Sequence, residues 1–299
     1  NINIECPSFK RELPNNKQIW DLRGHNKRIL KYDLNHLNIL AKLFEDSDDY
    51  ESAKLPRIHS KSVFQIIEIL GNTSKRFSDF PYYLSFCWHE TNDQAKGNIV
   101  RETGYPDPLG YNLIYSGPHI FTGNAFYKTP RFRCTEKGHY DVIRLLDINK
   151  DFLPRSNYKL TSVGEKYIQQ LKDGFGDAWI SKYRLAFRMM LNHTADRTLN
   201  AAIIPPNTSH INSLLSLSFE DNYKLLIAFA FSNSIVLDFF LRSTGSANLN
   251  NSKIKYFPYN EKKPITKHLL VRSLLLSCIT SHYKLLWKSL YSNEFLTSS

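Results

Sequence analysis

The segment from Glu220 to Leu241 constrains the fold of this chain more than any other part of the sequence. Between Leu225 and Leu237 almost every residue is apolar, and the polar interruption is confined to Ser232-Asn233-Ser234. A helix that is apolar on all sides has no face suited to water, so it belongs inside a domain. The run is also shorter than the roughly 20 apolar residues that span a bilayer. The sequence therefore predicts one long, deeply buried helix and no membrane insertion.

The rest of the chain supplies helices near both ends and strands between them. Apolar residues recur at helical spacing behind Asp33 and behind Ser60, and a C-terminal helix is predicted over Leu269–Leu290. From Phe80 to about Pro154, short apolar and aromatic runs are separated by Gly and Pro, a pattern typical of a mostly antiparallel sheet. We therefore expect an α+β fold: a helical N-terminal part, then a mixed sheet with flanking helices and the long buried helix.

Further elements are predicted in the second half of the chain. Ser162 and Glu165 have the spacing of a capping box, which predicts the start of a helix. Strands are predicted over residues 183–188, 198–204 and 251–258. In the first of these strands Arg184 and Arg188 alternate with apolar residues, so we expect both arginines on its polar side.

The charge balance favours a polyanionic partner. Lys and Arg number 39 against 28 Asp and Glu, a net charge of +11, and each phosphate that a cation neutralises releases counterions. Aromatic residues make up 13% of the chain and can stack on bases, although most of them belong to the core. Charge by itself does not separate a nucleic-acid surface from a basic surface without that role.

One basic stretch interleaves small residues, aromatics and cations, from Ser116 to Arg133. Lys128, Arg131 and Arg133 alternate along it and are predicted to share one face of an extended segment. Lysine suits a phosphate, and arginine suits a phosphate or the edge of a guanine. The alternative interpretation is a solvated basic strand.

A loop before the predicted helix at residue 162 contributes Arg155 and Asn157. So close to a helix start, these side chains either contact the DNA backbone and a base edge or lock the loop to the sheet. Arg184 and Arg188 are candidates for DNA contact from the polar side of their strand.

Two loops beside the apolar helix complete the candidates. Arg197 either approaches DNA or forms an internal ion pair with Asp196, and the second role is favoured because the segment looks like a scaffold corner. Asn248 and Asn250 lie in a polar, Gly-bearing loop and carry short donors and acceptors. The bare pattern of that loop is also that of a helix C-cap followed by a turn.

The sequence contains no motif that identifies an active site. There is no Gly-rich cofactor loop, and Pro205-Pro206 follows Ile203-Ile204, the wrong residues for the Asn/Asp-Pro-Pro-aromatic loop that binds a flipped adenine. Neither a metal site nor a catalytic residue is predicted. The four cysteines lie far apart, which indicates reduced thiols in a cytoplasmic protein.

Three segments lie in a fixed order around the apolar helix: Tyr183–Arg188, then Ala195–Pro206, then Arg242–Pro258. This order resembles the target-recognition region of large, single-chain (Eco57I-like) bacterial adenine-N6 DNA methyltransferases, including type IIG restriction enzymes and BREX-like or DISARM-like phage-defence enzymes. The stretches that hold Lys128 and Arg155 are similar to segments of those enzymes, except that Ala125 stands where proline is usual. The resemblance covers about residues 80–260.

The resemblance implies a domain organisation in which DNA recognition and methyl transfer belong to different parts of the polypeptide. Residues 1–79 would be a helical segment or linker, 80–260 the DNA target-recognition domain, and 261–299 a helix packed on it. Double-stranded DNA would be the partner, together with a catalytic methyltransferase domain of the same polypeptide, which would hold S-adenosylmethionine. Because the sequence starts at Asn1 without that domain, we interpret it as a non-catalytic fragment.

Other defence-system subunits or a phage inhibitor are further partners that this resemblance suggests. Two alternatives stay open. The chain is an interaction module that docks a partner such as an acidic, DNA-mimicking inhibitor, or it contributes directly to a methyltransferase or nuclease active site.

Overall fold

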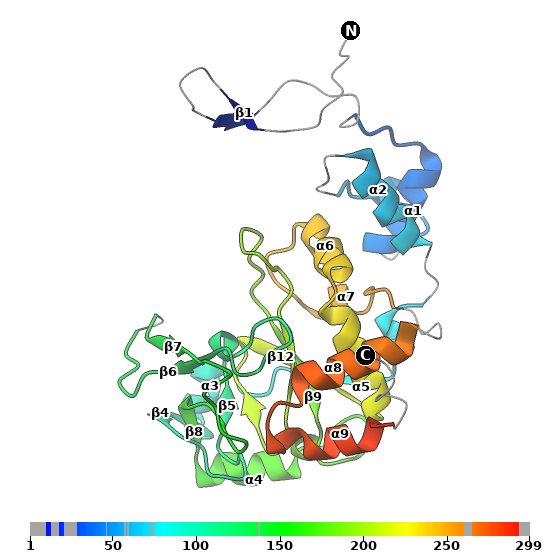
Figure 1. The fold of residues 1–299 in the computed structure, drawn as a ribbon. Coiled ribbons are helices and arrows are strands. Elements are labelled where there is room, and N and C mark those ends of the chain that lie inside the picture. The colour runs from blue at the N-terminus through cyan, green and yellow to red at the C-terminus, as the bar shows by residue number, and fades with distance from the viewer. Residues whose placement is uncertain are drawn as a thin grey trace. The chain divides into compact units, whose positions relative to one another are not determined.

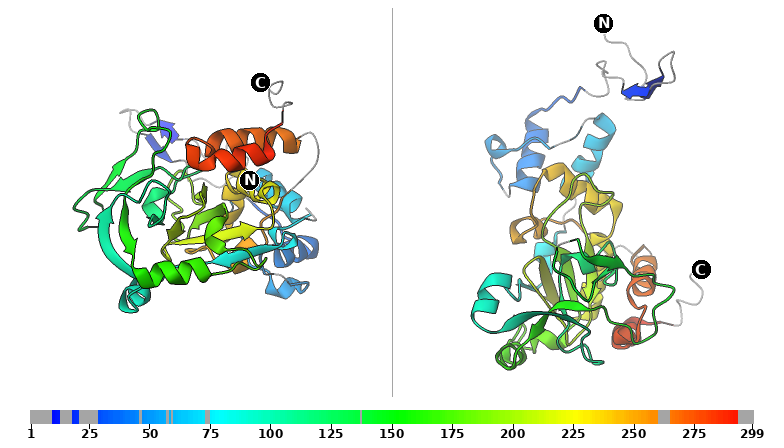
Figure 2. Two further views of the ribbon diagram at one scale, coloured as in Figure 1. Left: turned by 90° about the horizontal axis from the view of Figure 1, so that it is seen from below. Right: turned by 90° about the vertical axis from the view of Figure 1, so that its left-hand side faces the viewer.

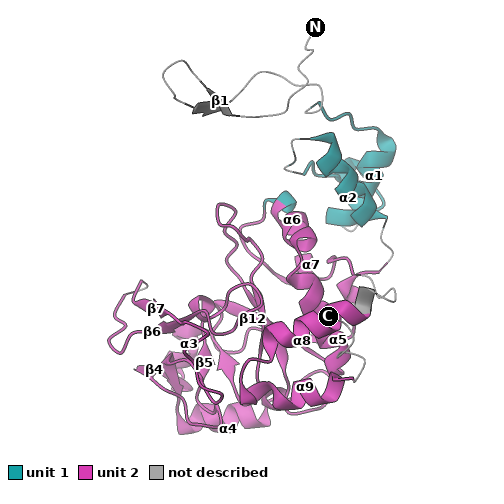
Figure 3. Cartoon of the chain, viewed as in Figure 1, with its two compact units in different colours: residues 1–74, 243–245 teal, residues 75–242, 246–299 magenta. Residues whose placement is uncertain are grey.

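Two groups of elements make up this α+β chain (Figure 1). The computed structural model describes residues 10–12, 18–20, 29–45, 47–56, 58, 60–72, 75–136, 138–259 and 265–292. Clustering of contacts gives unit 1, residues 1–74 with 243–245, and unit 2, residues 75–242 with 246–299 (Figure 3).

Unit 1 is mainly helical, as its sequence predicts. Its elements are β1 (Lys10–Glu12), β2 (Gln18–Trp20), α1 (Leu34–Phe44), a 3-10 turn (Tyr50–Ser52) and α2 (Lys61–Gly71). The two expected caps are confirmed, because the Asp33 side chain accepts from the backbone N–H of His36 and that of Ser60 accepts from Val63. The helices bury apolar side chains that include Leu40, Leu43, Phe64 and Ile67.

A four-stranded antiparallel sheet forms the centre of unit 2. In spatial order it consists of β10 (Ala201–Ile204), β9 (Arg184–Arg188), β12 (Leu214–Phe219) and β3 (Tyr82–Ser85). All of β10 and β12 is buried, so the sheet is covered on both faces. The strands predicted at 183–188 and 198–204 are confirmed, the second over a shorter range.

The apolar segment over residues 225–237 is helical, but it is not one helix and it is not buried throughout, because Ile235 is 77% exposed and Val236 is 50% exposed. It forms α5 (Asn222–Ser232) and α6 (Ile235–Thr244), which meet at an angle of 66°. The break falls at the polar interruption: the Asn233 side chain donates to the carbonyl of Phe229 at 2.9 Å, and the Ser234 hydroxyl accepts from the next helix at 3.1 Å. These local bonds end one helix and begin the other.

None of the described helices is by itself long and apolar enough to cross a membrane. The pair α5 and α6 has the length and composition only when taken together across the bend. Within unit 2, α5 packs against β9, β10 and β12 on one side and against the C-terminal helices on the other (Figure 2).

Short strand pairs surround the central sheet. They are β4 (Ile99–Gly104) with β8 (Ser156–Leu160), β6 (Lys128–Pro130) with β7 (Tyr140–Val142), and β5 (Ile114–Tyr115) with β11 (Ser209–His210). The first two pairs are antiparallel and the third is parallel, so the mixed sheet character is confirmed. Short helical elements lie between them: a 3-10 turn (Phe77–Asp79), α3 (Glu90–Ala95), a second turn (Gly117–His119) and a third (Trp179–Ser181).

Two predicted element boundaries in the second half of the chain need correction. Helix α4 (Ser162–Gln170) is capped by Thr161, whose hydroxyl accepts from Gly164 at 3.2 Å, and Ser162 is already helical. The strand predicted over 251–258 begins instead as a helical turn, α7 (Asn251–Ile254).

The predicted C-terminal helix is not continuous either, just as the apolar segment forms α5 and α6. It consists of α8 (Ile265–Ser277), a 3-10 turn (Ser281–Tyr283) and α9 (Lys284–Leu290). Tertiary hydrogen bonds hold the chain between α8 and α9 away from α-helical geometry: the carbonyl of His282 accepts from the Tyr183 hydroxyl at 2.8 Å, and the Tyr283 hydroxyl donates to the carbonyl of Ile203 at 2.7 Å. These bonds to the sheet outweigh local helix propensity.

The cysteines form no disulfide among the described residues. Cys87, Cys134 and Cys278 are free thiols, and Cys6 lies outside the described part of the chain.

Candidate nucleic-acid interface

Three strand ends meet at one edge of unit 2 and bring cations and aromatic rings together. The end of β4, the end of β6 and the start of β8 lie side by side there. The register of β4 and β8 pairs Gly104 with Ser156, so the next residue of one strand, Tyr105, lies beside the preceding residue of the other, Arg155. Figure 1 shows these strands with β7 at one side of unit 2. Seven residues at this edge, hereafter the β6 cluster, are Arg101, Tyr105, Lys128, Arg131, Phe132, Arg133 and Arg155.

Arg155 holds the β6 cluster together. Its Nε donates to the carbonyl of Pro130 at 2.7 Å and its Nη1 donates to the Tyr105 hydroxyl at 2.9 Å. The guanidinium lies 4.5 Å from the ring centre of Phe132 and 5.2 Å from that of Tyr105. Cation–π contacts of this kind stabilise a guanidinium on an aromatic face. Arg155 therefore fixes the positions of two aromatic rings.

The two rings remain open to solvent. Tyr105 is 60% exposed and Phe132 is 67% exposed, and their ring centres lie 6.0 Å apart in an edge-to-face arrangement. Large aromatic side chains that remain this exposed beside several cations are typical of surfaces that bind single-stranded or unpaired bases.

Three further cations lie on β6 and on the turn that follows it. Arg131 forms an ion pair with Asp141 at 2.9 Å, with both side chains more than half exposed. Arg133 is exposed, and among the described residues its side chain has no hydrogen-bond or ion-pair partner. Lys128 lies 5.1 Å from the ring centre of Tyr127. The prediction that Lys128, Arg131 and Arg133 alternate on one face is wrong, because β6 ends at residue 130 and a turn follows.

A buried polar network lies beneath the β6 cluster. Asn157 is buried; its amide donates to the Tyr140 hydroxyl at 2.9 Å and accepts from Thr103 at 3.0 Å. His119 is fully buried, and its Nε2 donates to the carbonyl of Arg155 at 2.8 Å while its Nδ1 accepts from the backbone of Ser116 at 2.9 Å. This pattern fixes a neutral imidazole with the proton on Nε2.

Burial lowers the pKa of His119 to about 4, so the ring stays neutral at physiological pH. Asn157 has a structural role, because its side chain is 6% exposed and bonds to Thr103 of β4 and Tyr140 of β7. It lies in β8 and not in the loop that the sequence predicted.

Arg184 does not lie on a polar face. It is completely buried, 3.9 Å from the ring centre of Trp179, and its Nη2 donates to the carbonyls of Thr208 at 2.6 Å and Pro205 at 3.3 Å. Desolvation lowers the pKa of Arg184 to about 10. The expectation of a solvent-facing arginine at this position is therefore wrong, because β9 is a central strand covered on both faces.

Arg188 lies at the end of β9 and is half-buried. Its Nε donates to the carbonyl of Gly117 at 2.7 Å, and its guanidinium lies 5.9 Å from the ring centre of Tyr127. Burial lowers the pKa of Arg188 as well. Because Lys128 contacts the same ring, Arg188 extends the β6 cluster along β6.

Arg197 has an internal partner, as the favoured interpretation expected, but the partner is not Asp196. Its Nη2 donates to the carbonyls of Asn233 at 2.9 Å and Ser234 at 3.1 Å, and its Nε lies 3.5 Å from the carboxylate of Asp238. Arg197 therefore caps the C-terminal end of α5, where the helix dipole favours a cation.

The two asparagines of the loop before α7 are both exposed. Asn248 pairs through its backbone with Met190, and the side-chain oxygen of Asn250 accepts from the Ser252 hydroxyl at 2.7 Å. The β-bridge with Met190 places Asn248 next to the segment that follows Arg188.

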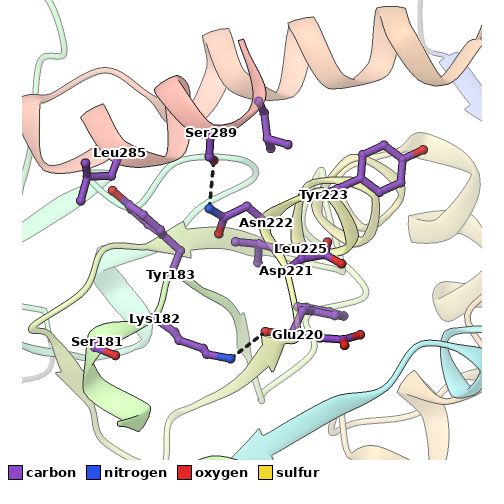
Figure 4. A pocket seen from close by; sticks show the side chains of 12 residues that line it. Ser181, Lys182, Tyr183, Glu220, Asp221, Asn222, Tyr223, Leu225, Leu285 and Ser289 are labelled. Carbon is purple, nitrogen blue, oxygen red and sulfur yellow. Dashed lines mark hydrogen bonds between the residues drawn. The ribbon is translucent and has the colours of Figure 1, made fainter. Parts of the chain in front are cut away.

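A pocket of about 520 Å³ opens elsewhere in unit 2, between the start of α5 and α9 (Figure 4). Lys182 lines it, but its Nζ already lies 3.1 Å from Asp173 and 2.9 Å from Asp177. Asn222 donates to Ser289 across the pocket at 2.9 Å. Among the described residues its lining contains no His or Cys.

No three His, Cys, Asp or Glu side chains within the described ranges come together as a metal site. Sequence reasoning missed Arg101, Tyr105 and the role of Phe132. Arg101 donates to the carbonyl of Cys134 at 3.4 Å and thereby joins β4 to the turn that carries Arg133. The signal for it was the alternation of residues 101, 103 and 105 along a strand.

No protein-family model and no curated protein sequence matches this chain. The family resemblance of its motifs therefore remains a prediction.

Proposed function

We propose that this chain is the DNA target-recognition module of an adenine-N6 DNA methyltransferase from a restriction or phage-defence system. The observation that carries the proposal is the β6 cluster, which gathers five cations and two exposed aromatic rings on one edge of unit 2. The net charge of +11 supports it, since a basic surface attracts a polyanion. The order of the sequence motifs supports the choice of enzyme class.

The residues of the cluster suit different parts of DNA. Lys128 carries a compact charge that suits a phosphate, while Arg131 and Arg133 have the planar fork that binds a phosphate or the O6 and N7 atoms of guanine. Outside the cluster, in the loop before α7, Asn248 and Asn250 carry amide groups that suit an adenine edge. Transfer of the methyl group and capture of the adenine belong, in this proposal, to a catalytic domain of the same polypeptide that binds S-adenosylmethionine.

Burial and hydrogen bonding support a division of the candidates into proposed contact residues and supporting residues. Arg184, Arg197 and Asn157 are bonded within the fold, so we assign them to the scaffold. Arg131 and Arg133 are exposed, and the ion pair of Arg131 with Asp141 is solvated on both sides, where such pairs contribute little. These two arginines are therefore free to exchange their present surroundings for DNA.

The test is duplex binding across a salt series, with random DNA and DNA from the methylated sites of the source genome. Each phosphate contact contributes about −0.9 to the slope of log affinity against log salt. If Arg131 and Arg133 each neutralise one phosphate, the double variant Arg131→Ala/Arg133→Ala reduces the slope by about 1.8. Between 50 and 200 mM salt its affinity relative to the wild type then changes by about 12-fold.

Lys166→Ala is the matched control, because Lys166 is an exposed cation on α4, beyond the opposite end of β8. It should leave the slope within experimental error. Equal slopes for the wild type and the double variant, or no binding to any duplex at low salt, would contradict the proposal. Binding without preference for one sequence would retain DNA binding and refute target recognition.

A further inference from the structure

The two exposed rings of the β6 cluster rest on one well-anchored side chain, Arg155. Arg155 is held at four points: its backbone N–H donates to Thr129 at 3.0 Å, its carbonyl accepts from His119, and its guanidinium bonds to Pro130 and Tyr105. Phe132 rests on that guanidinium at 4.5 Å. One side of the Phe132 ring is therefore supported, while 67% of the residue stays open to solvent.

An open aromatic face of this kind needs a flat partner. In an intact duplex both faces of every base are covered by neighbouring bases, and a protein meets only base edges and phosphates. An unpaired or extruded base exposes its face and stacks on an aromatic side chain with useful affinity whatever its identity. Arg131 and Arg133 flank Phe132 in sequence and can neutralise the phosphates on either side of such a nucleotide.

We propose that Phe132 and Tyr105, supported by Arg155, form a stacking site for an unpaired base in DNA. This inference rests on the proposed function and deepens it: the preferred ligand is a duplex that contains an unpaired nucleotide. The cluster thereby stabilises locally opened DNA.

The experiment compares two probes with the full chain. One is a fluorescein-labelled perfect duplex, and the other is the same duplex with one unpaired 2-aminopurine. Anisotropy gives both dissociation constants, and 2-aminopurine fluorescence reports stacking directly. We expect the wild type to prefer the bulged probe by about 5- to 150-fold, the range for one base on one aromatic ring. Binding should also quench the 2-aminopurine signal.

Phe132→Leu is the decisive variant, because leucine keeps the apolar volume but lacks a flat ring. It should lose the quenching and the preference, so that the ratio of the two dissociation constants falls towards one. Phe132→Trp should keep both. Tyr167→Ala removes an aromatic ring of similar exposure on α4 and should change neither quantity.

The outcomes distinguish the two proposals. Salt-dependent binding of both probes with equal affinity overturns the stacking site and leaves DNA recognition standing. Equal weakening of both probes by Phe132→Leu also overturns it, because the ring would then serve general contact. Failure to bind either probe refutes the proposed function together with this inference.

Discussion

Replacing Asp238 with alanine should destabilise unit 2 by about 3–5 kcal/mol. The Asp238 carboxylate is 8% exposed and accepts from the backbone N–H groups of Thr198 at 2.8 Å and Leu199 at 2.7 Å. It also lies 3.5 Å from Arg197 and 3.6 Å from Arg242. Alanine leaves two buried N–H groups unbonded, at about 1–3 kcal/mol each, and removes the partner of a half-buried cation.

Asp238→Asn keeps one oxygen that can accept the backbone bonds and loses only the charge, so we expect a cost of about 1–2 kcal/mol. Asp196→Ala is the control, since the Asp196 side chain is exposed and has no ion-pair partner in the described part of the chain; it should cost less than about 0.5 kcal/mol. Urea unfolding followed by tryptophan fluorescence measures all three, because Trp88 and Trp179 are buried in unit 2. A loss of stability for Asp196→Ala equal to that for Asp238→Ala would refute the role assigned to the Asp238 hydrogen bonds.

Two further perturbations test the buried parts of unit 2. Burial lowers the pKa of His119 to about 4 and that of His210 to about 3 from 6.5, so below pH 6.5 the unfolded chain binds protons that the native chain excludes. The free energy of unfolding should therefore fall as pH drops from 6.5 towards 4, by about 2.5 kcal/mol per histidine at pH 4.5. Urea unfolding measured across this pH range tests the expectation, and unfolding midpoints that stay constant would contradict it. In Gly164→Ala the new Cβ would lie 2.0 Å from the carbonyl oxygen of Asn98, so we expect a loss of about 2 kcal/mol after the gain in helix propensity. The control Gly138→Ala has open space at that position and should be nearly neutral in the same urea assay.

Local patterns in the sequence predicted many of the elements. Period-two alternation located β9, and the caps Asp33 and Ser60 located the first two helices, because these signals are set by neighbours in the chain. The fold class followed from the same patterns. The single long helix failed, since Asn233 and Ser234 form local hydrogen bonds that end α5 and begin α6.

The candidate site was harder to predict because burial depends on tertiary packing. The alternation that located β9 also placed Arg184 on a polar face, yet that face of the strand is covered and the arginine bonds to carbonyls from residues 205 and 208. Conversely, Tyr105 and Arg155 are 50 residues apart, and only the register of β4 with β8 brings them together. No local pattern in one sequence specifies such a register.

The buried network under the β6 cluster has an evolutionary consequence. His119 and Asn157 hold the backbone from below with bonds that do not involve the exposed side chains at positions 132 and 133. Under the proposed function, substitutions at those two positions would therefore alter which DNA is selected while the supporting frame persists. Diverging descendants of this chain should accumulate substitutions first at these surface residues, and replacement of the histidine or the asparagine should be tolerated far less often.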